Sequence, residues 1–145
     1  KTPSIKGLDG QAKMSKSLHN CVFLCNSEDE TAALVKKAKT DSERIITYDP
    51  EGRPEVANLL MLISLCTGEE PEVIATRIGD KGSGELKKAL TEALNEELRP
   101  LRSRRSELEK NPDYIRSVLL NGVTKAREIA SSTLDEVRAA MNMVI

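Results

Sequence analysis

Two lysines stand three residues apart near the start of the chain, with hydroxyl side chains between and after them. The segment reads Lys13-Met14-Ser15-Lys16-Ser17. Two ammonium groups, two hydroxyls and backbone amides at this spacing can surround a polyphosphate, and lysine suits the task because its charge is compact. The lysine pair alone leaves a second interpretation open, in which the segment is an ordinary solvated basic loop.

A second group of basic residues lies in the C-terminal half of the chain. Its members are Arg99, Arg102, Arg104, Arg105, Lys125 and Arg127. Arg and Lys presented by helices can bind the phosphates of an RNA stem, so this group is a candidate RNA-binding surface. The alternative is a solvated helix face, neutralised by the acidic neighbours Glu96, Glu97, Glu107 and Glu109.

Histidine and cysteine do not form a recognisable metal site. Cys21 and Cys25, with His19 nearby, fall short of the four ligands of a structural zinc site, so we expect no bound metal. We interpret His19 as a surface residue of the loop rather than a catalytic group. An odd cysteine count of three, completed by Cys66, fits a reducing compartment, and we expect a cytoplasmic protein.

The composition gives no global attraction to nucleic acid or to a membrane. Lys and Arg number 22 against 23 Asp and Glu, so any RNA contact must come from a local patch. Apolar residues make up 39% of the 145 positions, which is enough for one domain with a real core. The longest apolar run, Val56 to Cys66, is too short to cross a bilayer, and we expect no membrane partner.

Hydrophobic periodicity predicts helices for the middle of the chain. Ser27 and Glu30 have the spacing of a capping box, which predicts a helix over about 28–39. The segment 55–67 is apolar nearly all round and predicts a buried central helix. A proline opens the next segment, 71–78, which predicts a short helix.

The C-terminal half predicts longer amphipathic helices. One starts near residue 85 and carries a leucine stripe, Leu86, Leu90, Leu94, Leu98 and Leu101. Pro100 removes a backbone donor, so we expect this helix to kink or split there. A helix over 112–120 and, after Gly122, a last helix complete the chain. The last helix is expected to bury one face, made of Val123, Ala126, Ala130, Leu134, Val137 and Met141.

The predicted fold is therefore all-α, an antiparallel bundle of about five or six helices with a loop in front of it. We expect residues 1–26 to form the loop and a link, in which 21–25 is strand-like. Residues 27–145 then form the helical domain. This is the framework that must position the two lysines.

The five residues Lys13–Ser17 are, in this order, the signature that class I aminoacyl-tRNA synthetases carry on a mobile loop that closes over ATP. Over nearly its whole length the sequence resembles the bacterial tryptophanyl-tRNA synthetases. Besides the lead-in 7–12, the resemblance rests on Thr40-Asp41-Ser42, Val56-Ala57-Asn58-Leu59-Leu60, the turn 82–87, Leu98-Arg99-Pro100-Leu101 and Gly122-Val123-Thr124-Lys125-Ala126.

The resemblance implies a two-step reaction, in which tryptophan and ATP give tryptophanyl-adenylate and pyrophosphate before the aminoacyl group passes to tRNA(Trp). It implies that Lys13 and Lys16 are catalytic, that Lys13, Met14, Ser15, Lys16 and Ser17 bind ATP, and that Mg²⁺ accompanies ATP as a substrate complex. ATP and tryptophan would also need an N-terminal Rossmann domain that this sequence lacks, so the fragment alone is not expected to be active. The full-length enzyme would be a homodimer. A non-catalytic, synthetase-like RNA-binding or regulatory module is the alternative.

Overall fold

The computed structural model describes residues 5–10 and 12–143, so Gln11 and the first four residues of the predicted loop lie outside the described residues. The described part contains helices and irregular segments but no β-strand, and the all-α prediction is confirmed. The chain forms two compact units, with the boundary between Arg102 and Ser103. The division into a functional loop, 1–26, and a helical domain, 27–145, stays a prediction.

The capping box opens the first helix, α1 (Glu28–Lys36), as predicted. The Glu30 amide donates to the Ser27 hydroxyl over 3.1 Å, and the Ser27 amide donates to the Glu30 carboxylate over 2.8 Å. Each side chain thus satisfies a backbone donor that the first turn leaves without a helical partner. The same two contacts hold the pKa of Glu30 below its ordinary value, chiefly through the Ser27 backbone.

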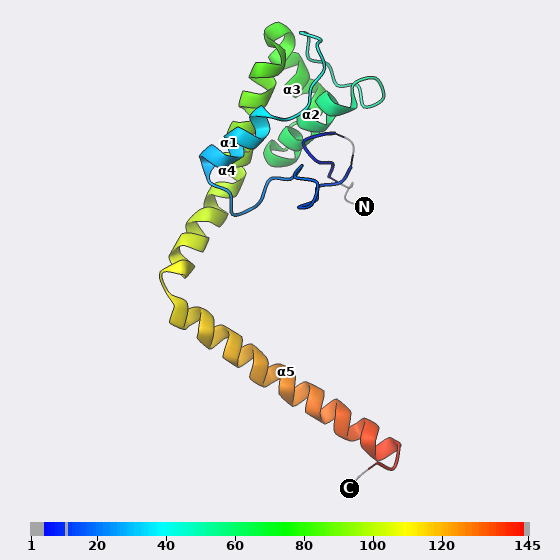
Figure 1. The fold of residues 1–145 in the computed structure, drawn as a ribbon, viewed down its shortest axis with the longest axis vertical. Helices are drawn as coiled ribbons and strands as arrows, with labels where there is room; N and C mark the ends of the chain where they lie inside the picture. Colours follow the sequence, from blue (N-terminus) through cyan, green and yellow to red (C-terminus); the bar gives the residue numbers. More distant parts are fainter. Residues whose placement is uncertain (1–4, 11, 144–145) are drawn as a thin grey trace. The chain divides into compact units, whose positions relative to one another are not determined.

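Helix α2 (Pro54–Thr67) is the buried centre of the first unit, which confirms the prediction from its apolar sequence. Its side chains pack against those of α1, α3 (Pro71–Ile78) and α4 (Gly82–Glu109) in one hydrophobic core. The fully buried members with the largest side chains are Leu59, Leu60, Ile63, Ile74, Leu86, Leu90, Val35 and Val56. Figure 1 shows these helices together in the first unit, where a 3-10 turn, Gly79–Lys81, joins α3 to α4.

The break expected at Gly122 is absent, because α5 (Pro112–Ala140) passes through it. Helix α4 also passes through Pro100 without splitting, so of the expected kink or split the split does not occur. The bond that Pro100 cannot make would go to the carbonyl of Glu96, and both residues are exposed, so water can replace it. A glycine inside a helix costs only about 1 kcal/mol relative to alanine, which is too little to end a long helix.

Two further expectations were wrong. Residues 21–25 form no strand but an irregular segment with a turn, and Phe23 and Leu24 are exposed. The structure also buries none of the described residues of α5, although its predicted apolar face does lie at helical spacing. Val123 is 44% exposed and Met141 63%. None of the helices in the described ranges is long and apolar enough to cross a bilayer.

Candidate functional site

The signature segment belongs to a loop that folds back on itself. Backbone hydrogen bonds close it, from the Gly7 amide to the Ala12 carbonyl over 2.8 Å and from the Met14 amide to the Ile5 carbonyl over 3.3 Å. Lys6 and Lys13 face each other as an isolated antiparallel bridge. The returning arm of this loop therefore begins at the first lysine of the signature.

The base of the loop is attached to the helical core. Leu8 is buried in the core cluster, and its carbonyl accepts a hydrogen bond of 3.0 Å from the Lys39 amide, which follows α1. The buried side chain of Asn58, in the middle of α2, donates to the Gly7 carbonyl over 2.8 Å. These bonds join the loop to α2 and to the segment that follows α1.

Gly10 lies close against the first turn of α2. Its φ of +71° lies in the left-handed region, and a Cβ at this position would stand 2.8 Å from the Cα of Glu55. Only glycine fits both conditions without strain. Beside this contact, the Lys39 ammonium pairs with the Glu55 carboxylate over 2.9 Å and holds the pKa of Glu55 below its ordinary value.

The signature residues divide by their surroundings. Lys13 and Lys16 are exposed, and within the described residues no carboxylate pairs with either ammonium group. Met14 packs partly against the core, whereas the hydroxyls of Ser15 and Ser17 are 3.0 Å apart. Two unpaired cations on a tethered turn can attract and hold a polyanion such as a polyphosphate.

His19 lies just past the signature and is exposed, as expected of a loop-surface residue. Its amide donates to the Lys16 carbonyl over 3.3 Å, and its φ is +51°. A positive φ is uncommon outside glycine, so the turn that carries Lys16 is tight.

The candidate RNA-binding arginines do not share one environment. Arg102 is held inside its own unit: its guanidinium donates to the Asn26 carbonyl, the Asn95 side chain and the Thr31 hydroxyl over 2.8–2.9 Å. It is therefore a link between α4 and the start of α1. Because these donors are occupied, the guanidinium is poorly placed to bind a phosphate.

The other members of the group are exposed. Arg99, Arg104 and Arg105 each form an ion pair with a glutamate three or four residues away on α4. Lys125 and Arg127 lie on α5. Exposed pairs of this kind contribute little to stability, so an RNA phosphate can compete for these arginines. Arg99 and Arg102 belong to the first compact unit, and Arg104, Arg105, Lys125 and Arg127 belong to the second.

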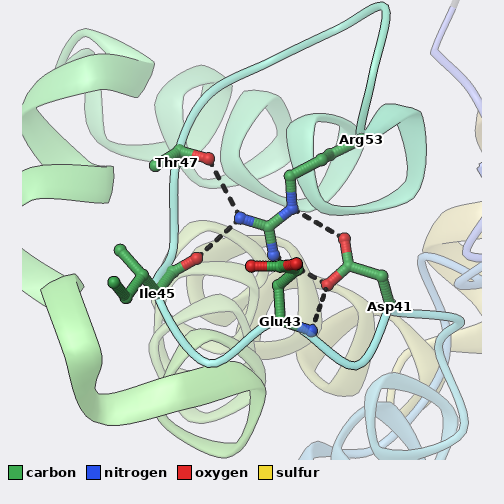
Figure 2. A network of polar contacts seen from close by, with 5 residues as sticks. All are labelled: Asp41, Glu43, Ile45, Thr47 and Arg53. Atoms are coloured by element: carbon green, nitrogen blue, oxygen red, sulfur yellow. Dashed lines mark hydrogen bonds and ion pairs between the residues drawn. The ribbon is translucent and has the colours of Figure 1, made fainter.

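A network of polar contacts, which was not predicted from the sequence, holds the segment between α1 and α2 in place (Figure 2). The Arg53 guanidinium makes two hydrogen bonds of 2.7 Å to the Asp41 carboxylate and further bonds to the Ile45 carbonyl and the Thr47 hydroxyl. The hydrogen bonds from Arg53 lower the pKa of Asp41, and a hydrogen bond from the Glu43 amide to the same carboxylate lowers it further. The only sequence signal was Asp41 within the Thr-Asp-Ser triplet, which carries no hint of its distant partner.

No group of His, Cys, Asp or Glu side chains in the described part of the chain is arranged to hold a metal ion. The three cysteines are free thiols, and burial raises the pKa of Cys66.

Comparison with known proteins gives this loop a context. The family model for class I tRNA synthetases (W and Y) matches residues 1–99. The chain belongs to this family. Tryptophan–tRNA ligase from Aquifex aeolicus is 42% identical over 98% of the chain, and the enzyme from Thermosynechococcus vestitus is 35% identical over 94%. The chain spans only 36% and 42% of these two relatives.

A solved structure agrees in fold. Tryptophanyl-tRNA synthetase from Campylobacter jejuni, complexed with ADP and tryptophan, superposes with a TM-score of 0.79 at 28% identity. The match covers 97% of the present chain and 44% of that protein. The resemblance inferred from the signature and the later segments is thereby confirmed.

Proposed function

We propose that this chain is the part of a tryptophan–tRNA ligase that supplies the ATP-handling loop and the tRNA-binding helices. The observation that carries the proposal is the exposed pair Lys13 and Lys16 on a loop fixed to the helical core, in a chain of this family. The similar tryptophan–tRNA ligases and the relative solved with ADP and tryptophan support the substrates. The full-length protein would act as a cytoplasmic homodimer.

In the first step, the tryptophan carboxylate attacks the α-phosphorus of ATP, an oxygen–phosphorus bond forms, and the bond to the departing pyrophosphate breaks. Negative charge grows on the pyrophosphate as it leaves. Lys13 and Lys16 would stabilise that charge, and the Ser17 hydroxyl and Mg²⁺ bound to ATP would share it. In the second step, a hydroxyl at the 3′ end of tRNA(Trp) attacks the carbonyl carbon of the adenylate, an ester bond forms, and AMP leaves. No covalent bond to the protein is needed.

The test is a lysine substitution in the full-length protein. Lys16→Ala should lower the rate of tryptophan-dependent ATP–pyrophosphate exchange by about two to three orders of magnitude, with little change in tryptophan binding, because the charge that Lys16 meets develops in the transition state. Lys88→Ala is the matched control, since it removes an exposed lysine from α4. Equal exchange rates in the two variants would exclude Lys16 from the mechanism.

The tRNA-binding role is proposed for the exposed basic residues Arg99, Arg104, Arg105, Lys125 and Arg127. Arg102 was included in the sequence prediction, but its bonds within the first unit favour a structural role. The remaining residues are exposed, and an RNA phosphate can compete with the glutamates that pair with Arg99, Arg104 and Arg105.

A further inference from the structure

Asn20 is a buried polar residue just outside the signature, and it is only 4% exposed. Its carboxamide oxygen accepts a hydrogen bond of 2.8 Å from the Ser15 amide. Its nitrogen donates to the Asp9 carboxylate over 2.9 Å and, at the longer distance of 3.4 Å, to the Lys13 carbonyl. The Asn20 carbonyl also accepts from the Leu8 amide over 2.8 Å.

These bonds join both arms of the loop to one residue, through its side chain at Asp9, Lys13 and Ser15 and through its backbone at Leu8. Leu8 and Asp9 belong to the outgoing arm, and Lys13 and Ser15 belong to the returning arm. Bonding to both arms requires a donor and an acceptor on the same small group. A carboxamide has both, whereas an ionised carboxylate can only accept. The space for the carboxamide is reserved by Gly7, because a Cβ there would overlap the amide atoms of Asn20.

The contacts separate the signature into two parts. From Lys13 to Ser15, the backbone is held by Asn20 on either side of Met14, which packs against the core. From Lys16 to His19, the side chains are exposed, and the hydrogen bond from the His19 amide to the Lys16 carbonyl closes a local turn. The Ser15 amide already has its acceptor, so it is not a free donor for a phosphate.

We propose that Asn20 is a positioning residue, which fixes the backbone of Lys13 and Ser15 within the loop, so that the Lys13 ammonium meets ATP in a set geometry when the loop closes. This inference rests on the proposed function, because it assigns Asn20 a part in the same site. Fixing a charged group in advance removes the ordering cost from the reaction step. A buried asparagine that served stability alone would have no effect specific to ATP.

The first test measures the loop itself and requires no activity. In the full-length protein, Asn20→Ala should speed hydrogen exchange of the Ser15 amide at least about tenfold, because its acceptor is gone. Asn26→Ala is the matched control, since Asn26 accepts from the Phe23 amide outside the signature loop. Equal protection of the Ser15 amide in wild type and Asn20→Ala would overturn the proposal.

The second test measures pyrophosphate exchange. Asn20→Asp keeps an acceptor for Ser15 but sets a second carboxylate against Asp9, and it should lower kcat/KM for ATP about tenfold or more while changing KM for tryptophan less than twofold. The double variant Asp9→Asn, Asn20→Asp returns a donor to this contact and should recover most of the loss.

The outcomes separate the two proposals. If the wild-type protein shows no tryptophan-dependent exchange, the proposed function fails, whatever the Ser15 amide does. If the wild type is active and Asn20→Asp has the kinetics of Asn26→Ala, the role of Asn20 is refuted while the function stands. If Asn20→Ala does not fold, the proposal is tested with Asn20→Asp and its double variant. These variants are compared by their effects on kcat/KM for ATP and on KM for tryptophan.

Discussion

Arg102 provides the sharpest test of the structural reasoning, because the sequence alone grouped it with its neighbours on α4. We predict that Arg102→Ala destabilises the first unit, whereas Arg104→Ala does not. The Arg102 guanidinium donates to the Asn26 carbonyl, the Asn95 side chain and the Thr31 hydroxyl over 2.8–2.9 Å. These partners lie on the segment before α1, on α1 and on α4.

The expected loss in the free energy of unfolding depends on how many hydrogen bonds are removed with the Arg102 side chain and on whether their acceptors keep another partner. A hydrogen bond from a charged donor contributes about 1.5–3 kcal/mol when it is well shielded, and these are partly exposed, so about 1 kcal/mol each is the better figure. Thr31 is fully buried but is not left unsatisfied, since its hydroxyl still donates to the Ser27 carbonyl over 2.8 Å. The expected loss in the free energy of unfolding is about 2–3 kcal/mol.

Urea denaturation followed by far-ultraviolet circular dichroism measures this loss. With a slope of about 1.5 kcal/mol per molar urea, the Arg102→Ala midpoint should fall by about 1.5–2 M. Arg104 is exposed and pairs only with Glu107, so Arg104→Ala should change stability by less than about 0.5 kcal/mol. Both variants place the same alanine in the same helix, and coincident midpoints would refute the structural role of Arg102.

Two further predictions concern pH and RNA. The Arg53 guanidinium lowers the pKa of Asp41 in the folded state, so its stabilisation is complete above the unfolded value of about 4 and is lost as the pH falls through the folded value. Asp41→Asn should flatten the fall in unfolding free energy below pH about 4, and an unchanged slope would contradict this. The double variant Arg104→Ala, Arg105→Ala should weaken tRNA binding and reduce its salt slope by up to about 2, with pyrophosphate exchange unaffected. Equal affinity at several salt concentrations would mean that this helix face is merely solvated.

The sequence predicted the features that depend on neighbours along the chain. The capping box at Ser27 and the helix 71–78 follow from local hydrogen bonding and backbone preference, and both are confirmed. The burial of α2 was also predictable, because an apolar surface nearly all round leaves a helix no solvent-facing side. The break expected at Gly122 was wrong, and no split occurs at Pro100, since an exposed proline or glycine weakens a helix without ending it.

Contacts between distant parts of the chain could not be predicted. A periodic apolar face on α5 indicates a helix, but periodicity does not tell what covers that face, and its described residues are exposed. The pairing of Arg53 with Asp41 and the bonds of Arg102 to the start of α1 join residues 12 and up to 76 positions apart. Both arginines are ordinary surface residues by sequence, and only the folded backbone brings their acceptors within reach.

The same reasoning explains why a short signature needs its surroundings. Two exposed lysines can attract a phosphate group at many places on a protein surface. Catalysis requires in addition that their ammonium groups lie close to the atoms on which negative charge develops in the transition state. In this chain, residues outside the signature hold the loop: Asn58 bonds to Gly7, Asn20 bonds to Lys13 and Ser15, and Gly10 lets the loop lie against α2. The buried helix that supplies Asn58 thus also supports the loop. If the proposed function is correct, substitutions of Asn58 that leave the protein folded should therefore lower the rate of pyrophosphate exchange in the full-length protein.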